Sequence, residues 1–231
     1  KSIVLMRAGE SKFDTKTKPE NRRLTGWTDV DLSSAGRRQA KVAARLLRDE
    51  GLVFQTACTS VLRRAVATAW TVLDETDCMW APLQTDWRLN PRHWGKLQGK
   101  ALGEIDEDID SYVHSGSLAP EPVEPDDERF PASTAYRGVP GDYLPASEST
   151  DDVSHRVSDA WQDAIRTQFE NISTLLVVAH WDSLEALARV LEGPAPAQPF
   201  RFAAPVVCHM TDALEIQECR VLALPEKLYT F

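Results

Sequence analysis

Residues 3–11 read Ile-Val-Leu-Met-Arg-Ala-Gly-Glu-Ser, an apolar run followed by a polar turn. Its first four residues are apolar without interruption, which is typical of a strand buried on both faces of a parallel sheet. The strand runs directly into the polar turn Arg7–Ser11. Because ligands of such sheets bind where strands end at the carboxyl edge, this turn is the first candidate for a functional site.

Alternating strand and helix patterns follow along the chain. The expected helices span about Ser33 or Ser34 to Glu50, Val61–Thr76, Asp152–Phe169 and Ser183–Leu191; the expected strands are Phe54–Thr59, Thr174–Ala179 and two or three closing strands within 205–224. This order predicts one α/β domain over residues 1–231, with a mostly parallel central sheet flanked by helices on both faces. We find no internal repeat.

Residues 119–150 differ in composition from the rest of the chain. They carry six prolines and the acidic run Asp126-Asp-Glu128. This composition predicts a long, stiff, solvated insertion. We expect a mobile, lid-like loop there, with a docking arm for another protein as the alternative.

Composition excludes several classes of protein. The chain has 231 residues, 42% of them hydrophobic and 26% charged, which is typical of a globular protein and not of a disordered or collagen-like one. No apolar run approaches the ~18–20 residues of a membrane span. The net charge of −9 argues against binding to nucleic acid or anionic membranes.

Neither the cysteines nor the histidines have the spacing of a metal site. Cys58, Cys78, Cys208 and Cys219 form no CxxC pair, so we expect reduced, mostly buried thiols in an intracellular protein. No metal and no cofactor are expected. The chain starts on Lys1, so a leader is allowed, and both the cytoplasm and the mitochondrial matrix stay open.

Three polar features are expected to meet at the carboxyl edge of the sheet. They are the turn Arg7–Ser11, the turn His180–Ser183 and Arg64 near the start of a helix. Two arginines and a histidine in one place would form a site for a phosphate or a carboxylate.

Further motifs then follow in order along the chain. They are Leu24-Thr-Gly-Trp-Thr-Asp-Val-Asp-Leu-Ser33 with Gly36, Thr59-Ser-Val-Leu-Arg-Arg-Ala65, Trp87-Arg-Leu-Asn90, Arg92-His93 with Gly95 and Leu97-Gln-Gly99, and Asp126-Asp-Glu-Arg-Phe-Pro131. Over nearly its whole length the chain resembles the cofactor-dependent phosphoglycerate mutases of the histidine phosphatase superfamily. The resemblance implies that family's α/β fold and a phosphoryl-transfer site at the carboxyl edge.

The resemblance also implies roles for single residues, and several positions depart from the family. In the family a histidine of an Arg-His-Gly-Glu-Ser motif is phosphorylated, and here that position is Ala8. The family's acid/base glutamate corresponds to Pro91. Some anion-binding positions are retained, namely Arg7, Ser11, Thr25, Gly26, Arg64 and the second histidine, His180.

Other departures weaken anion binding further. An asparagine of the family is Asp14 here, its tyrosine is Trp94, and its Gly-Asn after the second histidine is Trp181-Asp182. An adjacent arginine pair aligns with Val113-His114. A substrate lysine falls at or near Leu102, although Lys100 is close enough to leave that alignment open.

Losing the nucleophile alone costs roughly 10⁶-fold in rate, and losing the acid/base group costs a further 10²–10⁴ or so. We therefore favour a pseudoenzyme that serves as a structural or protein-interaction subunit of a larger assembly, with a homodimer also open. One alternative is a mutase or phosphatase inactivated by an engineered Ala8. Another is a non-catalytic sensor of a phosphorylated acid.

Simpler structural roles are available for the retained residues. Arg7 and Arg64 are expected to pair with Glu10, Asp14 or Asp182, because the added acids need partners. His180 is expected to hold a structural hydrogen bond. We expect Trp181 to fill the vacated pocket, with an exposed anchor for a partner protein as the alternative.

Overall fold

The first strand of the computed structural model, β1, spans Ser2–Arg7, and its residues 3–6 are buried as the apolar run predicts. The structure describes residues 1–14, 22–106, 108–124, 127, 136, 139, 143–192 and 200–229. The other strands are β2 (Thr56–Thr59), β3 (Leu83–Thr85), β4 (Thr174–Ala179), β5 (Pro205–Met210) and β6 (Ile216–Val221). They form one sheet in the order β3-β2-β4-β1-β5-β6.

The sheet is parallel across β3, β2, β4 and β1, and β5 and β6 are antiparallel. This arrangement confirms the predicted α/β fold with a mostly parallel sheet. Because β1 and β4 are parallel neighbours, with Arg7 opposite Ala179, both strands deliver their following turns to the same edge.

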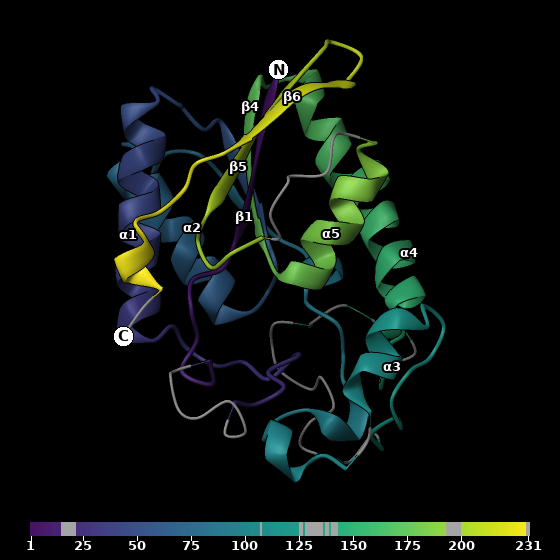
Figure 1. Ribbon diagram of the computed structural model, residues 1–231. Helices are drawn as coiled ribbons and strands as arrows, with labels where there is room; N and C mark the ends of the chain where they lie inside the picture. Colours follow the sequence, from purple (N-terminus) through teal and green to yellow (C-terminus); the bar gives the residue numbers. More distant parts are fainter. Residues whose placement is uncertain are drawn as a thin grey trace.

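Helices cover both faces of the sheet (Figure 1). They are α1 (Ser34–Asp49), α2 (Arg63–Glu75), α3 (Ile109–His114), α4 (Thr150–Ala160) and α5 (Trp181–Val190). Ile3 and Leu5 pack into the core that includes residues of α4 and α5, whereas Val4 and Met6 pack into the core on the α1 and α2 side. This alternation follows from the two-residue period of a strand.

Short helical turns complete the elements. They are the 3-10 turns η2 (Trp87–Leu89), η3 (Gly95–Leu97), η4 (Leu102–Glu104), η8 (Arg166–Glu170) and η9 (Glu226–Leu228), and the π-helical turn η7 (Trp161–Ile165). The predicted helix over 152–169 is therefore one α-helix followed by two turns of different pitch. Strand β3 and helix α3 are not among the predicted elements, because each is short.

The start of α1 confirms the predicted cap. The Ser33 hydroxyl accepts a hydrogen bond from the Gly36 amide at 2.9 Å. Gly36 is required there by contact: a Cβ atom at this position would lie 2.0 Å from the Glu10 carbonyl oxygen. The turn after β1 thus packs directly against the first turn of α1.

The described parts of the Pro-rich insertion 119–150 are held to the rest of the fold. The Lys96 amide donates to the Glu121 carbonyl at 2.9 Å. Tyr136 is buried, and its ring stacks on Trp27 with centroids 5.4 Å apart. Most of residues 125–142 lies outside the described residues, including Asp126 and Glu128 of the acidic run. Both the domain division and the mobility of this segment stay predictions.

Two cysteines correct the expectation of four reduced thiols. Cys208 of β5 lies directly opposite Cys219 of β6, and the two form a disulfide with Cα atoms 4.1 Å apart. Cys58 and Cys78 are free and buried, as expected, and burial raises the pKa of Cys58 to about 12. Among the described residues no helix is long and apolar enough to cross a membrane.

Candidate functional site

A cavity of about 150 Å³ lies at the carboxyl edge of the sheet, beyond the ends of β1 and β4. Its lining contains all but one of the predicted site residues: Arg7, Ala8, Thr25, Gly26, Arg64, Pro91 and His180. The exception is Ser11, which is fully buried away from the cavity. Its amide and hydroxyl both donate to the Asp14 carboxylate, at 3.1 and 2.6 Å.

Ala8 occupies the first position after β1 and is 3% exposed. Its amide donates to the carbonyl of Ala179, the last residue of β4, at 2.9 Å. This bond places Ala8 beside His180, the residue that follows Ala179. A methyl group therefore stands at the floor of the cavity, where it can neither attack phosphorus nor exchange a proton.

The Arg64 guanidinium is fixed by main-chain carbonyls. It donates to Thr28 and to Gly26, both at 2.8 Å, and its residue is only 5% exposed. Burial lowers its pKa to about 10. Because this value is still well above neutral pH, the guanidinium stays charged. Among the described residues, the charge is thus held at the cavity without a carboxylate in contact with it.

Arg7 is held by an aromatic side chain and a carbonyl. Its guanidinium carbon lies 3.8 Å from the ring centroid of Phe202 and 5.8 Å from that of Trp181, and one nitrogen donates to the Phe200 carbonyl at 3.3 Å. Burial is the largest influence on its pKa and lowers it, while the charges of Asp14 and Asp182 act in the opposite direction.

The prediction that the two arginines form ion pairs with nearby acids is wrong. Within the described residues, neither Arg7 nor Arg64 forms a salt bridge, and both donate to main-chain carbonyl oxygens. Glu10 instead accepts a hydrogen bond from the Ser33 hydroxyl at 2.6 Å and does not line the cavity. Backbone carbonyls leave no signal in a sequence, so this partnership could not be predicted from residue types.

His180 caps the start of α5 and forms a hydrogen bond between its Nε2 and the Ser60 hydroxyl at 2.8 Å. It is 6% exposed. Burial, followed by the positive charges of Arg64, Arg7 and Arg156, lowers its pKa well below the usual value. The ring is therefore neutral at pH 7, and the hydrogen bond is of the kind expected from the sequence.

Pro91 is positioned by its carbonyl oxygen. This oxygen accepts hydrogen bonds from the Trp27 indole at 2.6 Å and from Arg156 at 2.9 Å. Arg156 also contacts both carboxylate oxygens of Glu148, at 2.5 and 2.9 Å, in a buried ion pair. This pair could not be predicted from the sequence. Its members are eight residues apart, and only Arg156 lies within a helix, so no helical spacing relates the two.

Trp181 and Asp182 line the cavity at the start of α5. Trp181 keeps 40% of its surface exposed, so that it borders the cavity without filling it, contrary to expectation. One carboxylate oxygen of Asp182 accepts a hydrogen bond from the Arg92 amide at 3.3 Å. Leu102 and Lys100 do not line the cavity, and the side chains of Val113 and His114 lie outside the described part.

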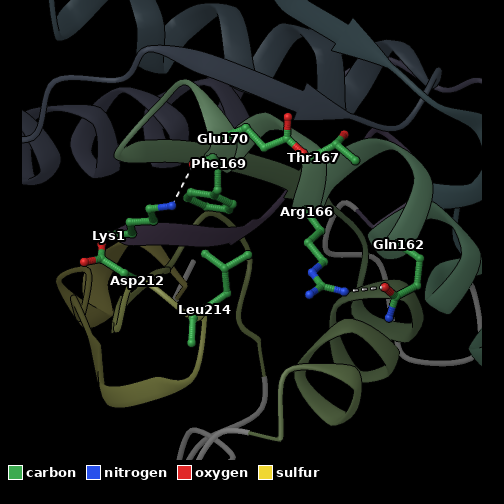
Figure 2. A pocket seen from close by; sticks show the side chains of 9 residues that line it. Lys1, Gln162, Arg166, Thr167, Phe169, Glu170, Asp212 and Leu214 are labelled. Carbon is green, nitrogen blue, oxygen red and sulfur yellow. Dashed lines mark hydrogen bonds between the residues drawn. The ribbon is translucent and has the colours of Figure 1, made fainter.

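A second, open hollow of about 400 Å³ lies at the opposite end of the sheet, next to Lys1, Phe169 and Asp212 (Figure 2). The Lys1 ammonium donates to the Phe169 carbonyl at 2.7 Å, and Arg166 donates to the Gln162 side chain at 3.1 Å. None of the predicted site residues lines this hollow. In the part of the chain that the structure describes, His, Cys, Asp and Glu form no cluster that would hold a metal.

Comparison with known proteins gives a family match for the chain. Residues 3–223 match the model of the histidine phosphatase superfamily, branch 1. A mycobacterial glucosyl-3-phosphoglycerate phosphatase is similar in structure, with 22% identity, a TM-score of 0.65 and coverage of 95% of this chain and 96% of that chain.

Two further solved structures are equally similar. A mycobacterial protein described as hydrolase 1 shows 23% identity, a TM-score of 0.66 and 95% coverage of both chains. YhfR of Bacillus stearothermophilus shows 22% identity, a TM-score of 0.66 and 94% coverage of both chains. These structures share the phosphoglycerate mutase-like fold, and the match to the family model over residues 3–223 shows that the chain belongs to the histidine phosphatase superfamily.

Proposed function

We propose that this protein is a non-catalytic member of its superfamily that binds a small phosphorylated ligand. The observation that carries the proposal is the cavity itself, which combines two charged arginines with a methyl group where the family has its nucleophile. Losing a covalent nucleophile costs roughly 10⁶-fold in rate, and Pro91 supplies no acid or base in its place.

Ligand binding is supported by the state of the two arginines. Arg7 and Arg64 keep their charge in a cavity and form no ion pair with an acid in the described structure. A buried cation that is not neutralised by the protein gains most from an anion, because charge-assisted hydrogen bonds to phosphate are about twice as strong as neutral ones. From the sequence we expected nearby acids to neutralise the two arginines. Because neither arginine forms such an ion pair in the described structure, binding of a phosphorylated ligand is the better supported hypothesis.

Thermal denaturation with and without ligand tests this proposal. The probes are inorganic phosphate, 3-phosphoglycerate and 2,3-bisphosphoglycerate. A ligand present at 100 times its dissociation constant stabilises the folded protein by about 2.7 kcal/mol. We expect a rise in Tm for the native chain and none for Arg64→Gln, while Arg63→Gln on the exposed side of the same helix turn retains the rise. No shift at millimolar concentration of any probe contradicts ligand binding.

A second function, as a protein-interaction subunit of a larger assembly, is supported by exposed apolar side chains. Val53, Met79 and Trp80 are 57%, 50% and 64% exposed. Val53 and Met79 are chain neighbours of Phe54 and Cys78, which are joined by a hydrogen bond from amide to sulfur at 3.3 Å. Val53 precedes β2, and Met79 and Trp80 precede β3, so the backbone at all three positions lies at the end of the sheet where these two parallel strands begin. Such groupings on soluble proteins often mark contact surfaces.

The native mass of the endogenous protein tests this second function. Size-exclusion chromatography of gentle extracts, with mass spectrometry of the fraction, is expected to place the protein in a large complex. Elution at the mass of a monomer or a homodimer contradicts the assembly and leaves ligand binding as the function.

A further inference from the structure

The cavity carries fixed charges of both signs. Arg7, Arg23 and Arg64 contribute three positive charges to its lining, and Asp14 and Asp182 contribute two negative ones. The resemblance to the mutases gives asparagine at both acidic positions. A cavity meant only for a phosphate gains nothing from these two carboxylates, because they repel an anion.

The fold holds these opposite charges apart. Arg64 is satisfied by the carbonyls of Gly26 and Thr28, and Asp14 accepts two hydrogen bonds from Ser11 through one oxygen, Oδ2. Asp182 also uses Oδ2, for the amide of Arg92. Each of these contacts is made within the protein, so that no acid of the cavity neutralises an arginine of the cavity in the described structure.

Each of the two carboxylates has one oxygen that can accept hydrogen bonds from a ligand. A carboxylate offers about four acceptor sites on its two oxygens. In the part of the chain described, Oδ1 of Asp14 and Oδ1 of Asp182 accept no hydrogen bond. Both acids line the same cavity as Arg7, and among the described residues no ion pair joins either of them to its guanidinium.

We propose that the ligand of this cavity is a small zwitterion, a phosphorylated primary amine, whose phosphate faces Arg7 and Arg64 and whose ammonium faces Asp14 and Asp182. This inference rests on the proposed function, because it names the class of ligand for the same cavity. The volume of about 150 Å³ suits a phosphate with a short carbon chain and is smaller than the about 300–1,000 Å³ of pockets for drug-sized ligands.

Isothermal titration calorimetry of the full chain with four probes tests the inference. The probes are inorganic phosphate, ethyl phosphate, phosphoethanolamine and phosphocholine. Phosphoethanolamine is expected to bind at least about tenfold more tightly than ethyl phosphate, because its ammonium donates charge-assisted hydrogen bonds to the carboxylates. It is also expected to bind more tightly than phosphocholine, whose ammonium has no hydrogen to donate.

Single substitutions test whether Asp14 and Asp182 cause the preference for phosphoethanolamine over ethyl phosphate. In Asp182→Asn, and separately in Asp14→Asn, the preference for phosphoethanolamine over ethyl phosphate is expected to fall to about twofold or less. The control Asp212→Asn changes the net charge equally at the other end of the sheet and is expected to keep the full preference.

The outcomes separate this inference from the proposed function. If phosphate and ethyl phosphate bind but phosphoethanolamine binds no better, the zwitterion is overturned and anion binding stands. Full preference in both asparagine variants also overturns the zwitterion. If none of the four probes binds, the anion site fails and the inference fails with it.

Discussion

The amide of Ala8 donates to the carbonyl oxygen of Ala179 at 2.9 Å, which joins the ends of β1 and β4 at the floor of the cavity. This bond and the contact of Gly9 with Gly36, where a Cβ atom would lie 2.6 Å from a carbonyl oxygen, hold the turn after β1 in place. The backbone of the turn after β1 is therefore fixed by contacts with the end of β4 and with the first turn of α1.

Restoring the nucleophile alone is expected to leave the protein inactive. In Ala8→His the imidazole returns, but Pro91 still provides no acid or base, and Asp14 and Asp182 still repel a phosphate. A malachite green assay of phosphate release and a coupled mutase assay are expected to show rates at the level of the buffer blank. A mutase-like rate in this single variant would show that the chain is an enzyme inactivated at one position.

Removing the Arg64 guanidinium is expected to destabilise the fold as well as to abolish ligand binding. In Arg64→Gln the carbonyls of Gly26 and Thr28 lose their donors inside the protein, which costs roughly 2–3 kcal/mol of unfolding free energy. Urea denaturation measures the change. Its neighbour Arg63, which pairs with Asp29 at the surface, is the control, and Arg63→Gln is expected to keep the midpoint of the native chain.

The buried pair of Arg156 and Glu148 is expected to be the most sensitive ionic contact. Glu148→Gln leaves the charge of Arg156 uncompensated in the interior, and breaking such a pair costs about 3–5 kcal/mol. The surface pair of Arg189 and Glu185 on α5, 3.8 Å apart, is the control, and its Glu185→Gln variant is expected to unfold at nearly the native urea concentration. Equal effects of the two substitutions would contradict the structural role of the Glu148–Arg156 pair.

The disulfide between β5 and β6 is expected to protect Cys208 and Cys219 from alkylation. Mass spectrometry after alkylation in denaturant, without reductant, is expected to label Cys58 and Cys78 only. Cys219→Ser is expected to lower the unfolding free energy by about 2–3 kcal/mol, given a separation of 11 residues in the sequence. Alkylation of all four thiols would contradict the bond.

Acid is expected to destabilise the protein through His180. Its pKa in the folded state is lowered well below the usual value, whereas in the unfolded chain it is about 6.5. Below pH 6.5 the unfolded chain binds a proton that the folded protein excludes, so stability falls as the pH decreases. We expect Tm to drop from pH 7.5 to 5.5, and to drop less in His180→Gln. The control is the exposed His155, whose glutamine variant should follow the native chain.

Much of the fold follows from local pattern, because long apolar or periodic segments are strongly specified. Thr174–Ala179 is a strand over the predicted residues, and Ser33 caps α1 as expected. β3 has three residues at the edge of the sheet and is too short for a periodicity to show. The disulfide was missed because it depends on the register of β5 against β6, which no spacing of cysteines reveals.

The candidate site could be located from the sequence, but its internal contacts could not. Motif residues far apart in the chain meet at one cavity, since parallel strands end at a common edge. The partners of Arg7 and Arg64 are carbonyl oxygens of Phe200, Gly26 and Thr28, whose positions depend on loop conformation. A sequence shows which acids are present but not that the fold keeps them apart from the arginines.

Phosphorus NMR tests the central claim, binding without turnover, most directly. A single sample holds the protein with phosphoethanolamine, and its ³¹P spectrum is followed over days at pH 7.5. The account predicts a resonance that shifts or broadens as protein is added, with no signal of inorganic phosphate growing in. A growing phosphate signal that depends on the protein would contradict the loss of catalysis, and a resonance unchanged by the protein would contradict binding.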